Sequence, residues 1–367
     1  MKILLFRSNN FFDSRVNKYH NYYERAGIDY TIVGWDRKCE GLQRAHYDFF
    51  HYRAGEAVGG MKAIRNHFKW MRFVYKYLKQ HCDVTTIHAC DLNSVFPAAL
   101  FKAIHKRDVM LVFDACDWYS SNFASYKLLN YLFGQMERFS CKWADELIIC
   151  EPERKAQIQF DLKKAPLVMR NIPEIDMKDI TEVQEKYKFD NDNPTLAYMG
   201  GFANGRFLME LLTLAETESF NLLIAGSGGK EYEEKCKELD KRENVRYFGR
   251  VNMLDGLKME NAADVVFAMY CKINPNHVYA APNKYYEAMM LGKPLITTKG
   301  TIPGDKVEKH DTGWAVEEDM EEMRFLLKGL NKEQMEEKGR KALKLWEGEF
   351  RDYLRNFFDN SYAKIIR

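Results

Sequence analysis

The feature that most constrains the fold of this 367-residue chain is a regular alternation of short apolar runs with amphipathic stretches. The short runs fit buried strands, and the longer stretches repeat their apolar residues with helical spacing. Such alternation predicts parallel strands joined by right-handed crossovers, which form a doubly wound α/β sheet. In the first half the predicted strands are residues 2–6, 30–34, 84–88, 109–114 and 146–150, and the predicted helices are 14–26, 62–79, 93–104 and 126–144.

The pattern then breaks and starts again. Residues 174–193 are charged and rich in Asp and Asn, as expected of a linker. A second alternating series follows it, and a long helical tract, residues 332–366, ends the chain. The predicted strands of the second series are residues 195–199, 221–225, 245–248 and 264–270.

Two domains therefore account for the length of the chain. We predict one Rossmann-like domain over residues 1–175 and another over 176–346. The tract that follows, about residues 347–367, is long enough to pack back on the first domain.

The net charge of +2 hides an asymmetry between the halves. Residues 1–170 hold 26 Lys and Arg against 18 Asp and Glu, and the rest hold 29 against 35, which gives +8 and −6. In residues 62–79 bases and aromatics alternate with helical spacing, as in a helix that rests on an anionic membrane. A half-buried helix whose long basic side chains reach the solvent gives the same pattern. No nucleic-acid partner is expected.

The eight cysteines are scattered without a C-x-x-C pair, which favours reduced thiols over disulfides or a zinc site. No apolar run approaches the roughly 20 residues that span a bilayer, and the first residues fit a strand better than a signal peptide. We therefore expect a cytoplasmic protein. Peripheral binding to the inner face of the plasma membrane is a further expectation. Asp190 and Asp192 precede a strand, so we interpret them as a solvated loop and predict no metal site.

A ligand site is predicted where a short helix follows the strand at 264–270. Residues 282–296 begin with Pro282, which suits a first helical position, and Gly292 ends the helix. The start of such a helix attracts anions. Lys284 adds positive charge, and Glu287 can accept two hydrogen bonds from a ribose diol. An ordinary helix with an exposed Glu is the alternative.

Glycine-rich strand-to-helix turns are predicted at two further places, where the backbone can approach a phosphate or nucleoside. In a parallel sheet such turns open onto one edge, where ligands bind. Arg206, just after the first turn, could pair with a diphosphate. Plain tight turns remain the alternative. The glycine-rich segments contain Gly200, Gly201, Gly226, Ser227 and Gly228.

Polar residues also follow the strands of the first half, at the expected facing edge. They are candidate contacts for a second substrate or acid/base groups, although a lone His after a strand is more often structural. These candidates are Asp13, Arg15, His88, Asp91 and Asp117.

Taken in order, these segments resemble glycosyltransferases of the GT-B fold, of the glycosyltransferase family 4 kind. The likeness spans nearly the whole chain and is carried by residues 200–206, 222–228, 245–250 and 283–294. In the first half, segments 13–16, 112–117 and 168–173 are similar to bacterial members that build surface polysaccharides. The resemblance implies two Rossmann-like domains that face each other across a cleft.

The resemblance also implies a reaction and its residues. It implies retaining sugar transfer from a UDP- or GDP-sugar in the C-terminal domain to a lipid-linked or glycan acceptor on the N-terminal domain. No metal or other cofactor is expected. Glu287 would hold the ribose, and Arg206 and Lys284 would lie near the diphosphate. Asn283 belongs to the same motif, and Arg250 and Val251 lie in the loop beside the base.

Where relatives carry a first Glu that contacts the donor sugar, this chain has Tyr279, for which His277 or Asn276 could substitute. Other departures lie at Gly201, Cys90 and Cys116, where relatives often carry Arg or His. Two alternatives therefore stay open. One is a nucleotide-sugar 2-epimerase on the same fold, and the other is a non-catalytic binding subunit.

Overall fold

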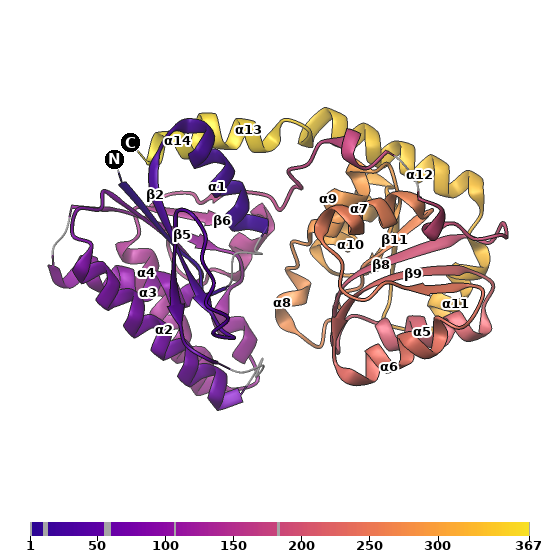
Figure 1. Cartoon of the computed structure of the whole chain (residues 1–367), viewed down its shortest axis with the longest axis horizontal. Coiled ribbons are helices and arrows are strands. Elements are labelled where there is room, and N and C mark those ends of the chain that lie inside the picture. Colours follow the sequence, from indigo (N-terminus) through magenta and orange to yellow (C-terminus); the bar gives the residue numbers. More distant parts are fainter. Residues whose placement is uncertain (1, 10–13, 55–59, 106–107, 182–183, 367) are drawn as a thin grey trace. The chain divides into compact units, whose positions relative to one another are not determined.

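The computed structural model describes residues 2–9, 14–54, 60–105, 108–181 and 184–366. It divides into two compact units (Figure 1). Unit 1 comprises Met1–Arg170 together with Leu354–Arg367, and unit 2 comprises Asn171–Tyr353. The sequence placed these divisions after residues 175 and 346.

Unit 1 is built on a seven-stranded parallel sheet with the order β3-β2-β1-β4-β5-β6-β7. The strands are β1 (Lys2–Phe6), β2 (Asp29–Asp36), β3 (Tyr47–His51), β4 (Thr86–Cys90), β5 (Met110–Ala115), β6 (Glu146–Ile149) and β7 (Leu167–Val168). The helices are α1 (Ser14–Ala26), α2 (Gly60–Gln80), α3 (Leu92–His105) and α4 (Lys127–Trp143), with short 3₁₀ turns at Tyr119–Phe123 and Pro152–Gln157.

Unit 2 repeats this plan with a six-stranded parallel sheet of order β10-β9-β8-β11-β12-β13. The strands are β8 (Thr195–Phe202), β9 (Asn221–Gly228), β10 (Val245–Tyr247), β11 (Val265–Phe267), β12 (Leu295–Thr298) and β13 (Gly313–Val316). The helices are α5 (Leu208–Thr217), α6 (Lys230–Leu239), α7 (Met253–Ala262), α8 (Pro275–Val278), α9 (Asn283–Met290), α10 (Ile302–His310), α11 (Met320–Gly329) and α12 (Lys332–Leu345), after 3₁₀ turns at Met177–Asp179 and Glu185–Tyr187.

Both units have helices on the two faces of the sheet, as right-handed crossovers require (Figure 1). In unit 1, α2, α3 and α4 cover one face and α1 covers the other. The two predicted Rossmann-like domains are therefore confirmed. The edge strands β3 and β7 were not predicted from the sequence.

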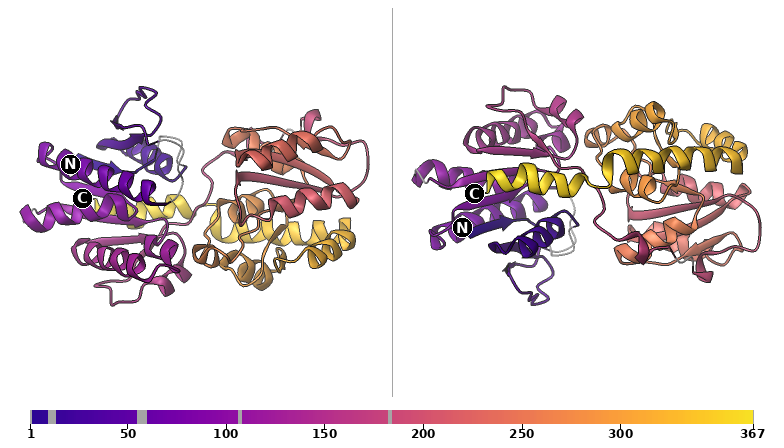
Figure 2. Two further views of the ribbon diagram at one scale, coloured as in Figure 1. Left: turned by 90° about the horizontal axis from the view of Figure 1, so that it is seen from below. Right: turned by 90° about the horizontal axis from the view of Figure 1, so that it is seen from above.

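The C-terminal tract is helical, as predicted, but it is not one regular helix. Two π-helical turns, Trp346–Phe350 and Phe358–Tyr362, interrupt it around α13 (Tyr353–Phe357), and α14 (Ala363–Ile365) ends it. From Leu354 onward the tract belongs to unit 1, where its yellow ribbon ends in the turned views of Figure 2. Rings of Tyr22 and Phe358 stack there with centroids 4.7 Å apart, so the tract packs on the first domain as predicted.

Candidate functional site

The glycine-rich segments of unit 2 lie side by side at the carboxyl ends of β8 and β9. They were predicted as turns, but they belong to the strands themselves, because the ladder continues to Phe202 and Gly228. The turns that precede α5 and α6 come after them. The paired residues are Gly200 with Gly226, Gly201 with Ser227, and Phe202 with Gly228.

Not all of these glycines need a ligand to explain them. A Cβ on Gly226 would lie 1.9 Å from the Gly200 carbonyl oxygen, and one on Gly228 would lie 2.0 Å from that of Phe202. Close pairing of the strands therefore requires glycine at both positions. Gly201 differs, since it is exposed and a Cβ there would have no neighbour among the described residues within 4 Å. Its backbone is open to an approaching ligand.

The loop after β10 joins the same edge. The Gly226 amide donates to the Gly249 carbonyl oxygen over 2.8 Å, which holds the loop beside the end of β9. Gly249 has a φ of 62°, in the left-handed region that favours glycine. Of the next two residues, Arg250 is exposed and Val251 is half-buried. The structure therefore brings the predicted base-side loop to the glycines.

Helix α9 carries Glu287, whose side chain is almost completely buried. Pro282 is the N-cap and not the first helical residue, and it has no side-chain acceptor for the first amides. Asn283 begins the helix and is half-buried. Gly292, with a φ of 64°, ends it as predicted.

Arg206 lies before α5, and its guanidinium stacks on the Tyr270 ring, 4.6 Å from the ring centroid. Burial raises the pKa of Tyr270, while the charges of Arg206 and Lys284 act to lower it. Tyr270 thus lies within reach of both cations and connects the loop before α5 to helix α9. Arg206 forms no ion pair with any residue that the structure describes. It is a positive group at this edge without a carboxylate partner among the described residues.

Lys284, which was expected near a diphosphate, is instead shared between two carboxylates. Its Nζ lies 2.6 Å from Oε1 of Glu260 and 2.5 Å from Oε2 of Glu287. Glu260 lies on α7 and is completely buried. It was not predicted from the sequence, because one acid in an amphipathic helix carries no signal. Its pairing with α9 is visible only in the folded chain.

Helix α8 ends directly before Tyr279, the position where the first Glu of the family motif is missing. Asn276 is buried, and Tyr279 and His277 are half-buried. The His277 ring packs 3.4 Å from the Cβ position of Gly205, and its Nδ1 lies 2.9 Å from the Cys271 carbonyl oxygen. Among the proposed substitutes for the missing Glu, His277 is the more exposed.

In unit 1, Arg15 and His88 belong to a buried polar network. Arg15 donates to both oxygens of Asp114, from Nε over 2.7 Å and from Nη2 over 2.6 Å. Nδ1 of His88 lies 2.7 Å from the Tyr362 hydroxyl, and burial lowers the pKa of His88. Both side chains are therefore committed inside the unit, which for His88 is the structural role that the sequence left open.

The same network offers a candidate cation cluster, since donor atoms of His88, Cys90 and Asp114 lie within 4.8 Å of one another. The pKa of Asp114 lies below its usual range. Burial acts to raise it, but the charge of Arg15 and the hydrogen bond with His88 lower it by more. A guanidinium that spans both carboxylate oxygens supplies the charge that a metal would bring. The cluster is accounted for as an ion-pair network.

The other acceptor candidates differ in exposure. Asp91 has a φ of 60° and accepts from Arg7 and from the Cys116 amide. Asp117 has a mostly exposed side chain, which accepts from Arg154 over 3.1 Å. Asp13 lies outside the described residues. Between the two described carboxylates, that of Asp117 is the more accessible.

The outer face of α2, α3 and α4 in unit 1 is basic and partly apolar, and we call it the helical face. These helices contain ten Lys and Arg and one acid, Glu137, which is buried. None of the six bases of α2 pairs with a described acid. Six of the nine exposed large apolar side chains of the described residues lie on or beside these helices: Phe68, Ile104, Tyr126, Leu128, Tyr131 and Leu132.

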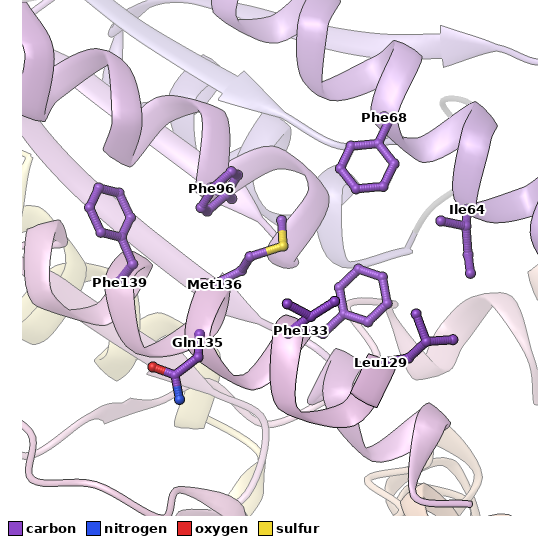
Figure 3. Close-up of a pocket in the computed structure, with 9 residues that line it drawn as sticks. Ile64, Phe68, Phe96, Leu129, Phe133, Gln135, Met136 and Phe139 are labelled. Atoms are coloured by element: carbon purple, nitrogen blue, oxygen red, sulfur yellow. The ribbon is translucent and has the colours of Figure 1, made fainter. Parts of the chain in front are cut away.

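A groove of about 610 Å³ runs between α2, α3 and α4 on this face. Eight of its nine lining side chains are apolar. Figure 3 shows Phe68 and Phe133 on opposite sides of the groove, Met136 between Phe96 and Phe133, and Gln135 directed away. No helix within the described ranges is both long and apolar enough to cross a membrane.

Comparison with known proteins agrees with this architecture. Residues 179–344 match the family model for glycosyl transferases group 1. Sucrose-phosphate synthase from Thermosynechococcus elongatus aligns with a TM-score of 0.74 at 15% identity, over 100% of this chain and 99% of that one. The Anabaena protein HepE, in complex with UDP and glucose, aligns with a TM-score of 0.70 at 14% identity, over 99% and 100%.

A third solved structure is the lipopolysaccharide outer core galactosyltransferase WaaB, with a TM-score of 0.61 at 14% identity, over 99% of this chain and 100% of that one. No curated protein sequence matches the chain. At these identities the structural likeness establishes the GT-B fold of the whole chain. Within that fold, residues 179–344 form a group 1 glycosyl transferase domain.

Proposed function

We propose that the enzyme transfers a sugar from a UDP- or GDP-sugar, bound by unit 2, to a hydroxyl of a lipid-linked or glycan acceptor, bound by unit 1. The bond from the anomeric carbon to the diphosphate oxygen breaks, and a bond to the acceptor oxygen forms with the same anomeric configuration. The nucleoside diphosphate leaves, and the hydroxyl proton passes to it or to solvent. The setting is the assembly of bacterial surface polysaccharide.

The observation that carries this proposal is the convergence of three features at one edge of the unit 2 sheet. Gly201 leaves the backbone open, Arg206 supplies a cation without a carboxylate partner, and Glu287 supplies a carboxylate. A departing diphosphate needs positive charge, and a ribose diol needs an acceptor. Arg206 can provide that charge without a divalent metal. The bound UDP and glucose of the HepE structure agree with this assignment.

The helical face of unit 1 supports a lipid-linked acceptor. Its surplus of bases suits anionic headgroups, and its exposed aromatic and aliphatic side chains suit the boundary between headgroups and acyl chains. The apolar groove offers a place for a hydrocarbon chain. We therefore place the enzyme at the inner face of the plasma membrane. WaaB, which shares the fold, is itself a galactosyltransferase of the lipopolysaccharide outer core.

Calorimetric titration with UDP, GDP, CDP and dTDP in the presence of a chelator tests the donor half. One nucleotide should bind the native chain, and Glu287→Ala should weaken it about 30-fold, which is about 2 kcal/mol for a lost bond to a charged acceptor. Glu308→Ala, exposed on α10, is the control and should bind normally. Unchanged binding to Glu287→Ala would remove the ribose assignment.

Turnover assays then distinguish the remaining alternatives. A 2-epimerase converts UDP-N-acetylglucosamine without an acceptor, whereas a transferase needs one. Failure of all four nucleotides to bind would favour a non-catalytic subunit. The anomeric configuration of the product, read by NMR, tests retention.

A further inference from the structure

Three charged side chains of unit 2, two from helix α9 and one from helix α7, lie in contact with one another. Nζ of Lys284 forms ion pairs with Oε1 of Glu260 on α7, over 2.6 Å, and with Oε2 of Glu287 on its own helix, over 2.5 Å. The side chain of Glu260 is fully buried, that of Glu287 is 4% exposed and that of Lys284 is 14% exposed. We call these residues the triad.

The triad carries one more negative than positive charge when all three groups are ionised. Glu287 alone would neutralise Lys284, so Glu260 is the surplus group. The charges of all three residues act on the pKa of the buried Tyr270, and Arg206 stacks on the Tyr270 ring. Both carboxylate oxygens of Glu260 are buried, and among the described residues neither has a hydrogen-bond partner beyond the ion pair of Oε1 with Lys284. A buried anionic oxygen without a donor is costly, whereas a protonated carboxyl is not.

We propose that Glu260 is a positioning residue of the nucleotide site, which shares Lys284 with Glu287 and takes up a proton when a nucleoside diphosphate binds. The inference rests on the proposed nucleotide site of unit 2. The proton comes from solvent to the Glu260 carboxylate, and no other covalent bond changes. Protonation of Glu260 removes the surplus negative charge of the triad beside the incoming anion, while Lys284 stays in place and the Glu287 side chain is left to the ribose.

The electrostatics of the triad agree with this direction. Burial raises the pKa of Glu260 to about 7, with Lys284 acting against the shift and Glu287 adding to it. The carboxyl is therefore partly protonated near neutral pH. An anionic ligand raises the pKa of a neighbouring acid further, because it disfavours the ionised form. Nucleotide affinity should then fall as the pH rises through neutrality.

The test compares proton exchange in the native chain and Glu260→Gln, which keeps the shape of the side chain but cannot titrate. Each protein is titrated at pH 7 with the nucleotide that binds best among UDP, GDP, CDP and dTDP, in two buffers of different ionisation enthalpy. On binding the nucleotide, the native chain should take up as much as about half a proton more than Glu260→Gln does. Protons exchanged by the phosphates of the nucleotide cancel in this comparison, because they contribute equally in both proteins. Between pH 6 and 8.5 the affinity of the native chain for the nucleotide should fall about three- to tenfold more than the affinity of Glu260→Gln.

Glu137→Gln is the matched control, because burial also raises the pKa of Glu137 to about 7, but in unit 1. It should behave as the native chain. If Glu260→Gln fails to fold, Glu260→Leu serves in its place, since an apolar residue of similar volume often replaces a buried charge without loss of stability.

Equal proton exchange and equal pH dependence in the native chain and the Glu260 variant would overturn the inference and leave the proposed function standing. A Glu137 variant that loses the proton uptake would also overturn it. Absence of nucleotide binding to the native chain would be a failure of the proposed function itself.

Discussion

At the residue scale, Glu137 is an ionisable group whose burial has a direct consequence for stability. Its side chain is buried on α4, and burial raises its pKa from 4.5 to about 7. The folded state therefore binds more protons than the unfolded state between these values. Proton binding by Glu137 therefore stabilises the folded state. This stabilisation is complete below pH 4.5 and is lost as the pH rises through 7.

Replacing Glu137 by Gln should remove this pH dependence. Between pH 4.5 and 8, the free energy of unfolding of the native chain should fall by up to about 3 kcal/mol more than that of Glu137→Gln. Urea unfolding at the two pH values measures this difference, and Glu231→Gln, exposed on α6, should match the native chain. A parallel pH dependence in native chain and variant would show that Glu137 does not titrate as described.

Residue types alone could predict part of the candidate site. Glu287 was found because helix-start and helix-stop signals bracket it, and both are local in the chain. Glu260 was missed because its partners lie on another helix. The sequence offered Arg15 as an acceptor contact and left a structural and a functional role open for His88, whereas the structure buries both side chains around Asp114. Local signals thus place a residue at an edge, but packing decides what it contacts.

At the scale of elements, the helical face of unit 1 makes a prediction about membrane binding. Changing Lys69, Arg72, Lys76 and Lys79 of α2 to Glu should abolish sedimentation with vesicles that contain anionic lipid, because each base near such a surface contributes about 1 kcal/mol. Nucleotide affinity should not change, since these residues lie in unit 1. The native chain should also dissociate as the salt concentration rises.

Two further variants separate the contributions of charge and apolar contact. Reversal of four bases in unit 2, Lys230, Lys237, Lys241 and Arg242, is the matched control and should leave sedimentation unchanged. Leu128→Ser with Leu132→Ser removes exposed apolar side chains of α4 and should weaken the binding that persists at high salt. Equal sedimentation of all these proteins would remove the membrane from the proposal.

The elements differ in how far their sequences could predict them. Helix α1 and strand β1 match their predicted ranges, because strong periodicity defines both ends. Strands β8 and β9 run three residues beyond the prediction, since glycine was taken as a turn signal where close strand pairing requires it. Strand β3 follows β2 without an intervening helix, so the alternation gave no sign of it.

At the scale of the whole molecule, both units have the same strand order around their first strands, and the alternation of the sequence could predict this repeated plan. The length and aromatic content of the C-terminal tract could also predict that it packs back on the first domain. The residues that anchor it could not be predicted, because its partners lie hundreds of positions away. The Tyr362 hydroxyl lies 2.5 Å from that of Tyr23 and 2.7 Å from Nδ1 of His88.

This anchor predicts that the last residues of the chain stabilise the first domain selectively. Tyr362→Phe keeps the ring but leaves two buried polar atoms without their partner, which should cost unit 1 about 2 kcal/mol. In native-state hydrogen exchange, amides of β1 and β4 should then exchange about 30-fold faster, while those of β8 should not change. Tyr187→Phe, which removes a 3.3 Å bond to the Asp255 carbonyl oxygen in unit 2, should give the opposite pattern. If Tyr362→Phe instead lowered protection in both units alike, the two units would unfold together, and the C-terminal tract would not be specific to unit 1.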